Sequence, residues 1–181
     1  MNRSQEFVHR VGLLRELMQA RGLQALVLSR HSNVAWLSAG ARTYVNMGAE
    51  TGEAWVVLTP SGEFLLTPNN ESERLLTEEF NELPLQLVSY PWWKGPSTTL
   101  QRLLGGLEKI GADAPLREIP NCVDVNGALL EVRSRLTALD QEKLRRLGRT
   151  VGQVLSGVAR VISPGETEYE ITGRLAQALA A

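Results

Sequence analysis

Apolar residues recur with two different spacings over the first 134 positions of the chain. Between residues 4 and 21 they follow a helical spacing, and Gly22 comes next as the expected helix end. Residues 23–29 then form a short continuous apolar run, which predicts a buried strand. The apolar positions of the first helix are Phe7, Val8, Val11, Leu14, Leu17 and Met18.

The alternation of helical and strand-like segments continues downstream. Pro60, Ser61 and Gly62 form a turn between two apolar runs, so residues 53–59 and 63–67 are expected to form a hairpin. Residues 41–52 have no clean period and are predicted to be a loop. The other expected helices are 32–40, 70–80, 97–111 (with Ser97 as its cap) and 123–136, and the other expected strands are 85–90 and 116–119.

Strands that alternate with helices, together with one hairpin, predict an α/β domain with a mixed sheet over residues 1–134. After that point the pattern becomes purely helical. One long helix is expected from 137 to 162, with the apolar stripe Leu144, Leu147, Val151, Val154, Leu155, Val158, Val161 and Ile162. Residues 163–165 (Ser-Pro-Gly) interrupt it.

A second helix is expected directly after this break. Thr167 and Glu170 have the spacing of a capping box, in which each residue bonds the other's backbone. The helix that follows carries Ile171, Leu175, Ala178 and Leu179 on one face. Residues 135–181 are therefore predicted to be two helices that begin a second domain.

Composition and charge narrow the class of protein. The chain has 181 residues, of which 43% are apolar and 22% charged, as in ordinary soluble proteins, and its net charge of −1 gives no electrostatic reason to bind nucleic acid. The basic residues between 143 and 149 are accompanied by Asp140 and Glu142, which is typical of a solvated helix face. Cys122 is the single cysteine, which fits a reducing compartment. With no apolar run behind the first ten residues and no membrane-length segment, we expect a cytoplasmic protein.

Local motifs for catalysis are missing from the sequence. Neither His9 nor His31 has a partner at metal-ligand spacing, and no nucleophile elbow or phosphate-binding loop occurs. His9 is expected at the helix surface, and the glutamates of 70–80 on a solvated face. His31 stands between a strand and a helix, where it would either help to position a ligand or serve the turn.

Two stretches remain as candidate binding sites. Arg42 and Tyr44 lie beside glycines in the irregular loop, a combination suited to gripping a carboxylate. Trp92 and Trp93 lie on a loop bounded by Pro91 and Gly95, where large aromatic side chains suggest an interface or a ligand wall. The alternative is that the two tryptophans cap the core, one facing in and one facing out.

The order of these segments resembles a known family. The run ALVLSRHSNVAWLSAG, the loop, the hairpin EAWVVLTPSGEFLLT and the segment VSYPWW resemble the amino-terminal domain of creatinase, prolidase and Xaa-Pro aminopeptidase, the pita-bread metallohydrolases. Residues 131–179 are similar to the junction into the catalytic domain of that family, with Pro164, Gly165, Thr167, Glu168 and Glu170 matching its turn.

The resemblance implies a three-layer mixed sheet with flanking helices over 1–134, followed by the first two helices of an incomplete pita-bread domain over 135–181. It also implies a parent hydrolase that uses a pair of divalent ions (manganese, cobalt or zinc) to cleave the bond before proline. The family's metal ligands come after the second helix, so we assign no catalytic or metal-binding residue here and expect the chain alone to be inactive.

The resemblance further implies that this region supports a homodimer and limits access to short peptides, through Arg42, Tyr44, Trp92 and Trp93. Two alternatives stay open. The parent could be a creatinase-type amidinohydrolase, which shares the amino-terminal fold. The chain could also be a free-standing module, without catalysis, that binds or regulates a partner.

Overall fold

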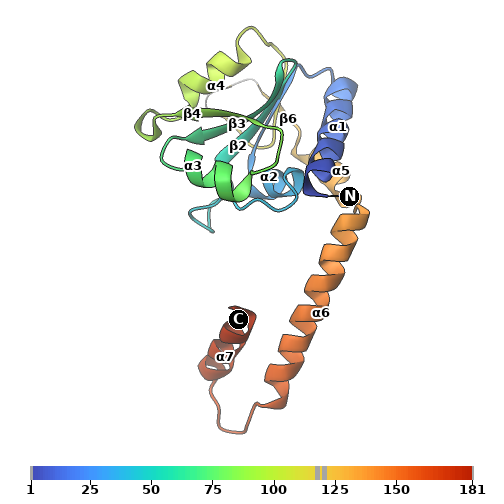
Figure 1. Cartoon of the computed structure of the whole chain (residues 1–181), viewed down its shortest axis with the longest axis vertical. Helices are drawn as coiled ribbons and strands as arrows, with labels where there is room; N and C mark the ends of the chain where they lie inside the picture. The colour runs from blue at the N-terminus through green and yellow to red at the C-terminus, as the bar shows by residue number, and fades with distance from the viewer. Residues whose placement is uncertain (1, 117–118, 120–121, 181) are drawn as a thin grey trace. The chain divides into compact units, whose positions relative to one another are not determined.

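A computed structural model describes residues 2–116, 119 and 122–180 (Figure 1). The chain divides into two compact units, residues 1–134 (unit 1) and 135–181 (unit 2), and each is described by itself. The helices and strands of unit 1 are α1 (Arg3–Arg21), β1 (Ala25–Arg30), α2 (His31–Leu37), β2 (Thr51–Thr59), β3 (Gly62–Pro68), α3 (Ser72–Arg74), the π-helix η1 (Leu75–Glu79), β4 (Gln86–Tyr90), the 3-10 turn η2 (Trp92–Lys94), α4 (Ser97–Leu104), β5 (Ile110–Ala112), β6 (Val123–Asp124) and α5 (Asn126–Ser134).

The six strands form one mixed sheet in the order β4-β3-β2-β1-β5-β6. The hairpin of β2 and β3 is antiparallel, with Thr59 opposite Gly62, and β2 is also antiparallel to β1. The outer pairs, β3 with β4, β1 with β5 and β5 with β6, are parallel. The predicted α/β domain with a mixed sheet is confirmed.

Both faces of the sheet are covered, which gives three layers. Along β1, Leu26 and Leu28 pack on one face with Phe7 and Leu14 of α1. Ala25 and Val27 point to the other face and pack with residues of α4. Neighbouring strand residues point to opposite sides, so a strand covered on both faces must be apolar throughout. Each fully buried leucine contributes about 1.5–3 kcal/mol.

Helix α1 departs from its predicted orientation. Its start is fixed by a capping box between Asn2 and Gln5, and Gly22 ends it in the left-handed conformation as expected. However, Val8 is 57% exposed, while Glu6 and Arg10 are buried. The prediction that Val8 faces the core was wrong because the helix is rotated to bury a charged pair that has partners inside the fold.

Segments predicted as single helices are shorter or divided. Residues 70–80 form α3 and the π-helix η1, in which Phe80 N donates to Leu75 O and both side chains enter the core. Helix α4 follows Pro96 and ends at Leu104, so Ser97 is its first residue and not its cap. Residues 110 and 111, predicted as the end of this helix, belong instead to β5 (Ile110–Ala112), because they pair with β1.

The segment 123–136 is also divided, into β6 and α5. Its first residues pair with β5, which the helical spacing of its apolar positions did not indicate. In the predicted strand 116–119, Leu116 and Ile119 are not in a strand, and the other two residues lie outside the described part of the chain.

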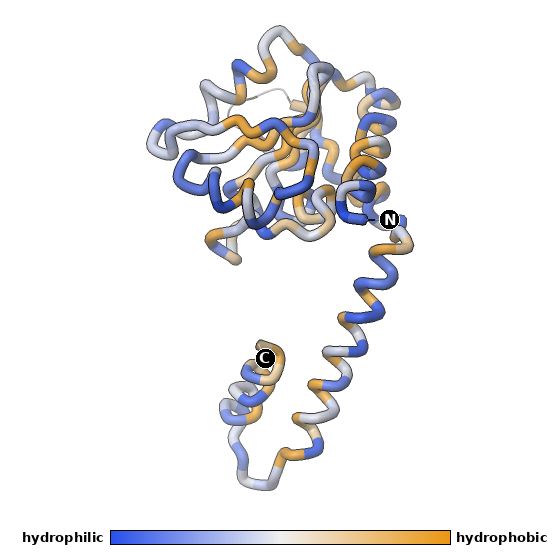
Figure 2. Tube along the Cα trace, viewed as in Figure 1, coloured by the Kyte–Doolittle hydropathy of each residue, from blue (hydrophilic) through white to orange (hydrophobic). Residues whose placement is uncertain are grey.

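Unit 2 consists of α6 (Ala138–Arg160) and α7 (Glu168–Ala180). Each helix begins with a capping box: Thr137 with Asp140, and Thr167 with Glu170. Arg174 of α7 bonds Val161 O and Glu166, which ties the second helix to the turn before it. Figure 2 shows orange and blue alternating along both helices, as the amphipathic pattern predicts.

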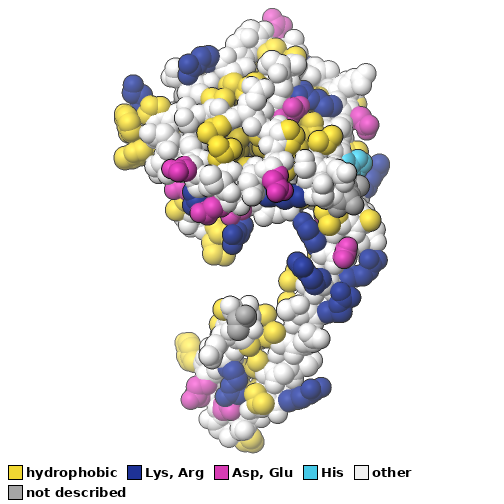
Figure 3. Space-filling model, viewed as in Figure 1, with side chains coloured by type: hydrophobic (Ala, Val, Ile, Leu, Met, Phe, Trp, Pro, Cys, Tyr) yellow, Lys and Arg dark blue, Asp and Glu magenta, His cyan; other side chains and the backbone are white. Residues whose placement is uncertain are grey.

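Much of the apolar stripe of unit 2 remains on the surface. Val158 is buried, but hydrophobic side chains stay visible along both helices (Figure 3). The large exposed ones from 136 onward are Leu136, Leu144, Leu147, Leu155, Val161, Ile162, Tyr169 and Leu179. No helix among the residues that the structure describes is both long and apolar enough to cross a lipid bilayer.

Candidate functional site

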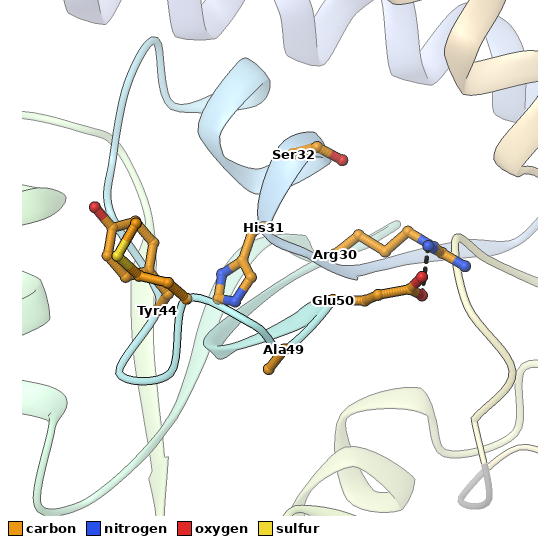
Figure 4. Close-up of a pocket in the computed structure, with 7 residues that line it drawn as sticks. Arg30, His31, Ser32, Tyr44, Ala49 and Glu50 are labelled. Carbon is orange, nitrogen blue, oxygen red and sulfur yellow. Dashed lines mark hydrogen bonds and ion pairs between the residues drawn. The ribbon is translucent and has the colours of Figure 1, made fainter. Parts of the chain in front are cut away.

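An open pocket of about 320 Å³ lies where β1 passes into α2 (Figure 4). Its walls come from the strand–helix junction and from the loop 41–50, and its centre is the ring of His31. The lining residues are Arg30, His31, Ser32, Tyr44, Met47, Ala49 and Glu50. The sequence had marked two parts of this site separately, His31 and the loop with Tyr44, and the fold brings them together.

His31 is held from three sides. Its backbone N–H donates to Glu50 O over 3.1 Å, its Nδ1 lies 3.0 Å from Thr43 Oγ1, and its ring meets that of Tyr44 edge-on with centroids 5.7 Å apart. Its Nε2 atom is buried and has no hydrogen bond within the described residues. A buried ring nitrogen without a partner carries a desolvation cost. A hydrogen bond to a polar group of a ligand would remove that cost, with the nitrogen as donor or acceptor according to the tautomer.

Gly52 makes this placement of His31 sterically feasible. A Cβ atom at residue 52 would lie 2.7 Å from His31 Nδ1 and 2.5 Å from Thr43 Oγ1, closer than a Cβ atom normally approaches another heavy atom. Glu53 N also donates to Thr43 O, which fixes the loop beside β2. The glycine therefore permits the close approach of the loop and the histidine.

The outer part of the loop presents apolar side chains to solvent. Tyr44 and Val45 are exposed, and Met47 is 82% exposed. The backbone beneath them is held at both ends by the contacts of Thr43 and Glu50. The site thus has a floor held in place by hydrogen bonds around His31 and an apolar rim of Tyr44, Val45 and Met47.

Charged groups form the opposite wall of the pocket. Arg30 pairs with Glu50 over 2.7 Å, as the dashed line in Figure 4 shows, and its Nε donates to Asp113 O over 2.8 Å. Glu50 itself is largely exposed. A charged ligand could therefore replace one partner of the ion pair between Arg30 and Glu50.

Arg42, predicted to grip a carboxylate, contacts an internal one. Its backbone N–H donates to Glu79 Oε2 over 2.8 Å, and its Nε lies 3.1 Å from Glu79 Oε1. Glu79 is buried, whereas the Arg42 side chain is 72% exposed. The guanidinium is thus oriented by Glu79 while its outer end faces solvent, and its role toward a substrate stays a prediction.

Trp92 and Trp93 lie on η2, directly after the edge strand β4. Each is 63% exposed, and the two rings meet edge-on with centroids 6.0 Å apart. The alternative in which one of them fills the core is therefore wrong. Neither tryptophan lines the His31 pocket, and an interface role stays a prediction.

Sequence reasoning missed a buried polar network behind the pocket. Asp113, at the end of β5, accepts hydrogen bonds from Ser29 N, Ser29 Oγ, Arg30 N and Asn33 Nδ2. Arg133 of α5 donates to Asn33 Oδ1 over 2.7 Å. Burial lowers the pKa of the Arg133 guanidinium, and the nearby Asp113 carboxylate partly opposes this shift. No motif could have revealed the network, because its members come from three distant parts of the chain: residues 29–33, Asp113 and Arg133.

The pair of divalent ions implied by the resemblance does not fit these residues. Within residues 2–116, 119 and 122–180, no group of three His, Cys, Asp or Glu side chains converges as metal ligands would. The carboxylates near the pocket already have partners, Asp113 in its network and Glu50 on Arg30. We therefore derive no chemical step through a metal from this part of the chain.

The mixed sheet with helices on both faces, and the loop 41–50 held beside the β1–α2 junction, make this a three-layer α/β domain. The chain belongs to the creatinase/prolidase N-terminal domain family, whose model matches residues 10–135. No curated protein matches the sequence. Membership confirms the expected family and its fold.

Solved structures show the same fold over nearly the whole chain. The dipeptidase PepE from Mycobacterium ulcerans is 20% identical with a TM-score of 0.72, and the match covers 98% of this chain and 50% of that one. A prolidase from Thermococcus sibiricus (14%, TM-score 0.74) is covered to 49%, and 96% of this chain is matched. An X-Pro aminopeptidase from Thermotoga maritima (12%, TM-score 0.69) is covered to 48%, with 93% of this chain matched. The chain thus spans about half the length of each of these three structures.

Proposed function

We propose that this chain forms the amino-terminal, non-catalytic part of a metal-dependent Xaa-Pro peptidase of the cytoplasm. In this proposal, the loop 41–50 narrows the access of peptides to a catalytic site built by other parts of the enzyme. The pair of divalent ions belongs to that catalytic site. Family membership and the fold match over nearly the whole chain support the assignment, and the lone Cys122 fits a reducing compartment.

The observation that carries the access role is the construction of the loop. Thr43 and Glu50 hold its ends against His31, while Tyr44, Val45 and Met47 remain exposed. Apolar side chains on an anchored loop are suited to contacting another surface or a bound peptide without a large ordering cost. Arg42, Trp92 and Trp93 are further candidates for this contact surface.

The proposal has a direct biochemical test. The purified chain should bind no stoichiometric manganese, cobalt or zinc by calorimetry and should not cleave Gly-Pro or Ala-Pro. The product of the gene's complete reading frame should cleave them. In that product, Tyr44→Ala or Met47→Ser should raise kcat/KM for longer peptides more than for dipeptides, because the shorter side chains would widen the access that the loop narrows. Val8→Ser, an exposed position on α1, is the control.

Three outcomes would contradict this function. Turnover by the chain alone would place catalysis within it. A stop codon directly after Ala181 would instead indicate a free-standing binding module. Hydrolysis of creatine by the complete product, without Xaa-Pro cleavage, would indicate an amidinohydrolase.

We also propose that the chain forms a homodimer through unit 1 and through α6 and α7. Exposed leucines on both helices support helix pairing, because contiguous apolar surface tends to be covered. They are Leu144, Leu147, Leu155 and Leu179. Multi-angle light scattering should give twice the monomer mass of 19.9 kDa. A monomer at all concentrations, with both helices ordered, would contradict this.

A further inference from the structure

Strand β4 is an open edge of the sheet. It is the last strand in the order, and its described partner is β3 alone. In Figure 1 it lies at the left edge of unit 1, and hydrophobic side chains gather at the same edge in Figure 3. An edge strand presents backbone N–H and C=O groups that can pair with another strand.

The register identifies which groups are open. In a β-strand, the N–H and C=O groups of one residue point toward the same neighbouring strand, and those of the next residue point to the opposite side. Asn69 N donates to Tyr90 O over 2.8 Å, so the backbone groups of Tyr90, and by alternation those of Val88 and Gln86, face β3. Leu87 and Ser89 therefore direct their backbone groups outward, and both residues are exposed.

This edge lacks the usual protection against pairing. Edge strands are commonly guarded by charged side chains, but residues 83–93 (LPLQLVSYPWW) contain none. Pro84 and Pro91 limit pairing to the five or six residues between them, since proline has no N–H. Charge-free strands can also lie antiparallel to a copy of themselves without placing like charges opposite each other.

Trp92 and Trp93 extend this surface just beyond the strand. Both indoles are 63% exposed and Leu87 is 39% exposed. Aromatic side chains bury roughly 150–250 Å² each, so four indoles from two copies would supply on the order of a third of a standard interface of about 1,600 Å². Because the indoles supply only part of a standard interface, we expect the association of the two copies to be weak and to depend on protein concentration.

We propose that the β4 edge pairs antiparallel with the β4 edge of a second copy of this chain. In the symmetric register, Leu87 of one copy exchanges hydrogen bonds with Ser89 of the other, and Val88 lies opposite Val88. Every outward backbone group of these residues then has a partner. The tryptophans of each copy lie beyond the end of its strand and cover the start of the other copy's strand, near Pro84 and Gln86.

This contact rests on the proposed homodimer, of which it specifies the surface in unit 1, and it is separate from the pairing of α6 and α7. The test therefore uses the full chain with Leu147→Glu and Leu155→Glu, which place charges on the exposed helix stripe. In this background, sedimentation velocity from micromolar to submillimolar concentration should still show a monomer–dimer equilibrium. Loss of all association in this background would overturn the β4 proposal and leave the helix pairing supported.

Two substitutions at the edge test the contact itself. Leu87→Lys places like charges near each other across the two-fold axis, and Ser89→Pro removes an outward N–H without removing a bond to β3. Each should raise the dissociation constant at least tenfold. Val8→Lys on α1 is the matched control, and circular dichroism checks that each variant remains folded. Unchanged dimerisation in both edge variants would overturn the proposal.

Amide hydrogen exchange gives an independent readout of strand pairing. Exchange at Leu87 and Ser89 should slow as concentration rises, because their N–H groups become hydrogen-bonded in the dimer. Val88, already bonded to β3, is the internal control. If exchange at Leu87 and Ser89 is independent of concentration, the two strands do not pair.

Discussion

Arg133 donates a hydrogen bond to Asn33 over 2.7 Å, although the two residues are one hundred positions apart. Through Asn33 Nδ2, the contact continues to Asp113, which also binds the backbone at Ser29 and Arg30. The network joins the ends of β1 and β5 to α2 and α5. Because α2 begins with His31, the same network supports the base of the candidate pocket.

Replacing Asp113 with alanine should strongly destabilise unit 1. The substitution leaves the donors at Ser29, Arg30 and Asn33 buried without an acceptor, and such losses cost about 2–4 kcal/mol. Urea unfolding would measure the change, with Glu108→Gln on an exposed carboxylate as the control. A loss below about 0.5 kcal/mol, the range of ordinary surface changes, would mean that the network is not a stabilising unit.

Alanine substitutions at two glycines should have opposite effects. Gly52→Ala should destabilise the fold by about 1–3 kcal/mol and displace His31, since the new Cβ would overlap Thr43 and the imidazole. Gly12→Ala, in the interior of α1 with open space around it, should stabilise by about 0.5–1 kcal/mol. Thermal unfolding and the NMR signals of the His31 ring would check both. Equal effects of the two changes would refute the close packing at residue 52.

Acid should weaken the start of α7. Hydrogen bonds from the backbone and then the hydroxyl of Thr167 lower the pKa of Glu170 from its ordinary value of 4.5, and Arg174 adds to this shift. A carboxyl group with a lowered pKa in the folded state stabilises it above the unfolded value, and this contribution is lost as pH falls through the folded value.

The expected result is therefore a loss of α7 helicity at a pH below 4.5, together with an NMR titration midpoint for Glu170 below that value. Glu170→Gln keeps an acceptor for Thr167 but cannot titrate, so the dependence of helicity on pH at this end should be smaller in the variant, with Glu166 and Glu168 left as the remaining acidic groups. A midpoint for Glu170 at or above 4.5 would contradict the capping contact.

The buried pair of Glu6 and Arg10 should be strongly coupled. Arg10 bonds Glu6 and the carbonyl of Trp36, and its guanidinium lies 5.3 Å from the centre of the Trp36 ring. Arg10→Met alone leaves a buried carboxylate without its cation and should cost about 3–5 kcal/mol. The double change Glu6→Leu with Arg10→Met should recover much of this loss. If the two single losses add up in the double variant, the pair is not coupled.

Local patterns were sufficient for much of the fold. The hairpin turn at 60–62, the end of α1 at Gly22 and the capping box of α7 depend on residues within a few positions of one another. Their hydrogen bonds form between neighbours in sequence, so spacing alone predicts them. The α/β class also followed from the alternation of apolar periods.

Other features were decided only by tertiary contacts. Residues 110–112 have the same apolar character in a helix or a strand, and pairing with β1 selected the strand. The burial of Glu6 and Arg10, about which the sequence pattern made no prediction, depends on the fold, because tertiary packing places Trp36 beside Arg10. Likewise, the pocket exists because β1, α2 and the loop 41–50 meet around His31. The sequence by itself determined the elements whose partners are local, while tertiary structure decided those stabilised by distant residues, since a linear pattern does not specify which distant groups will meet.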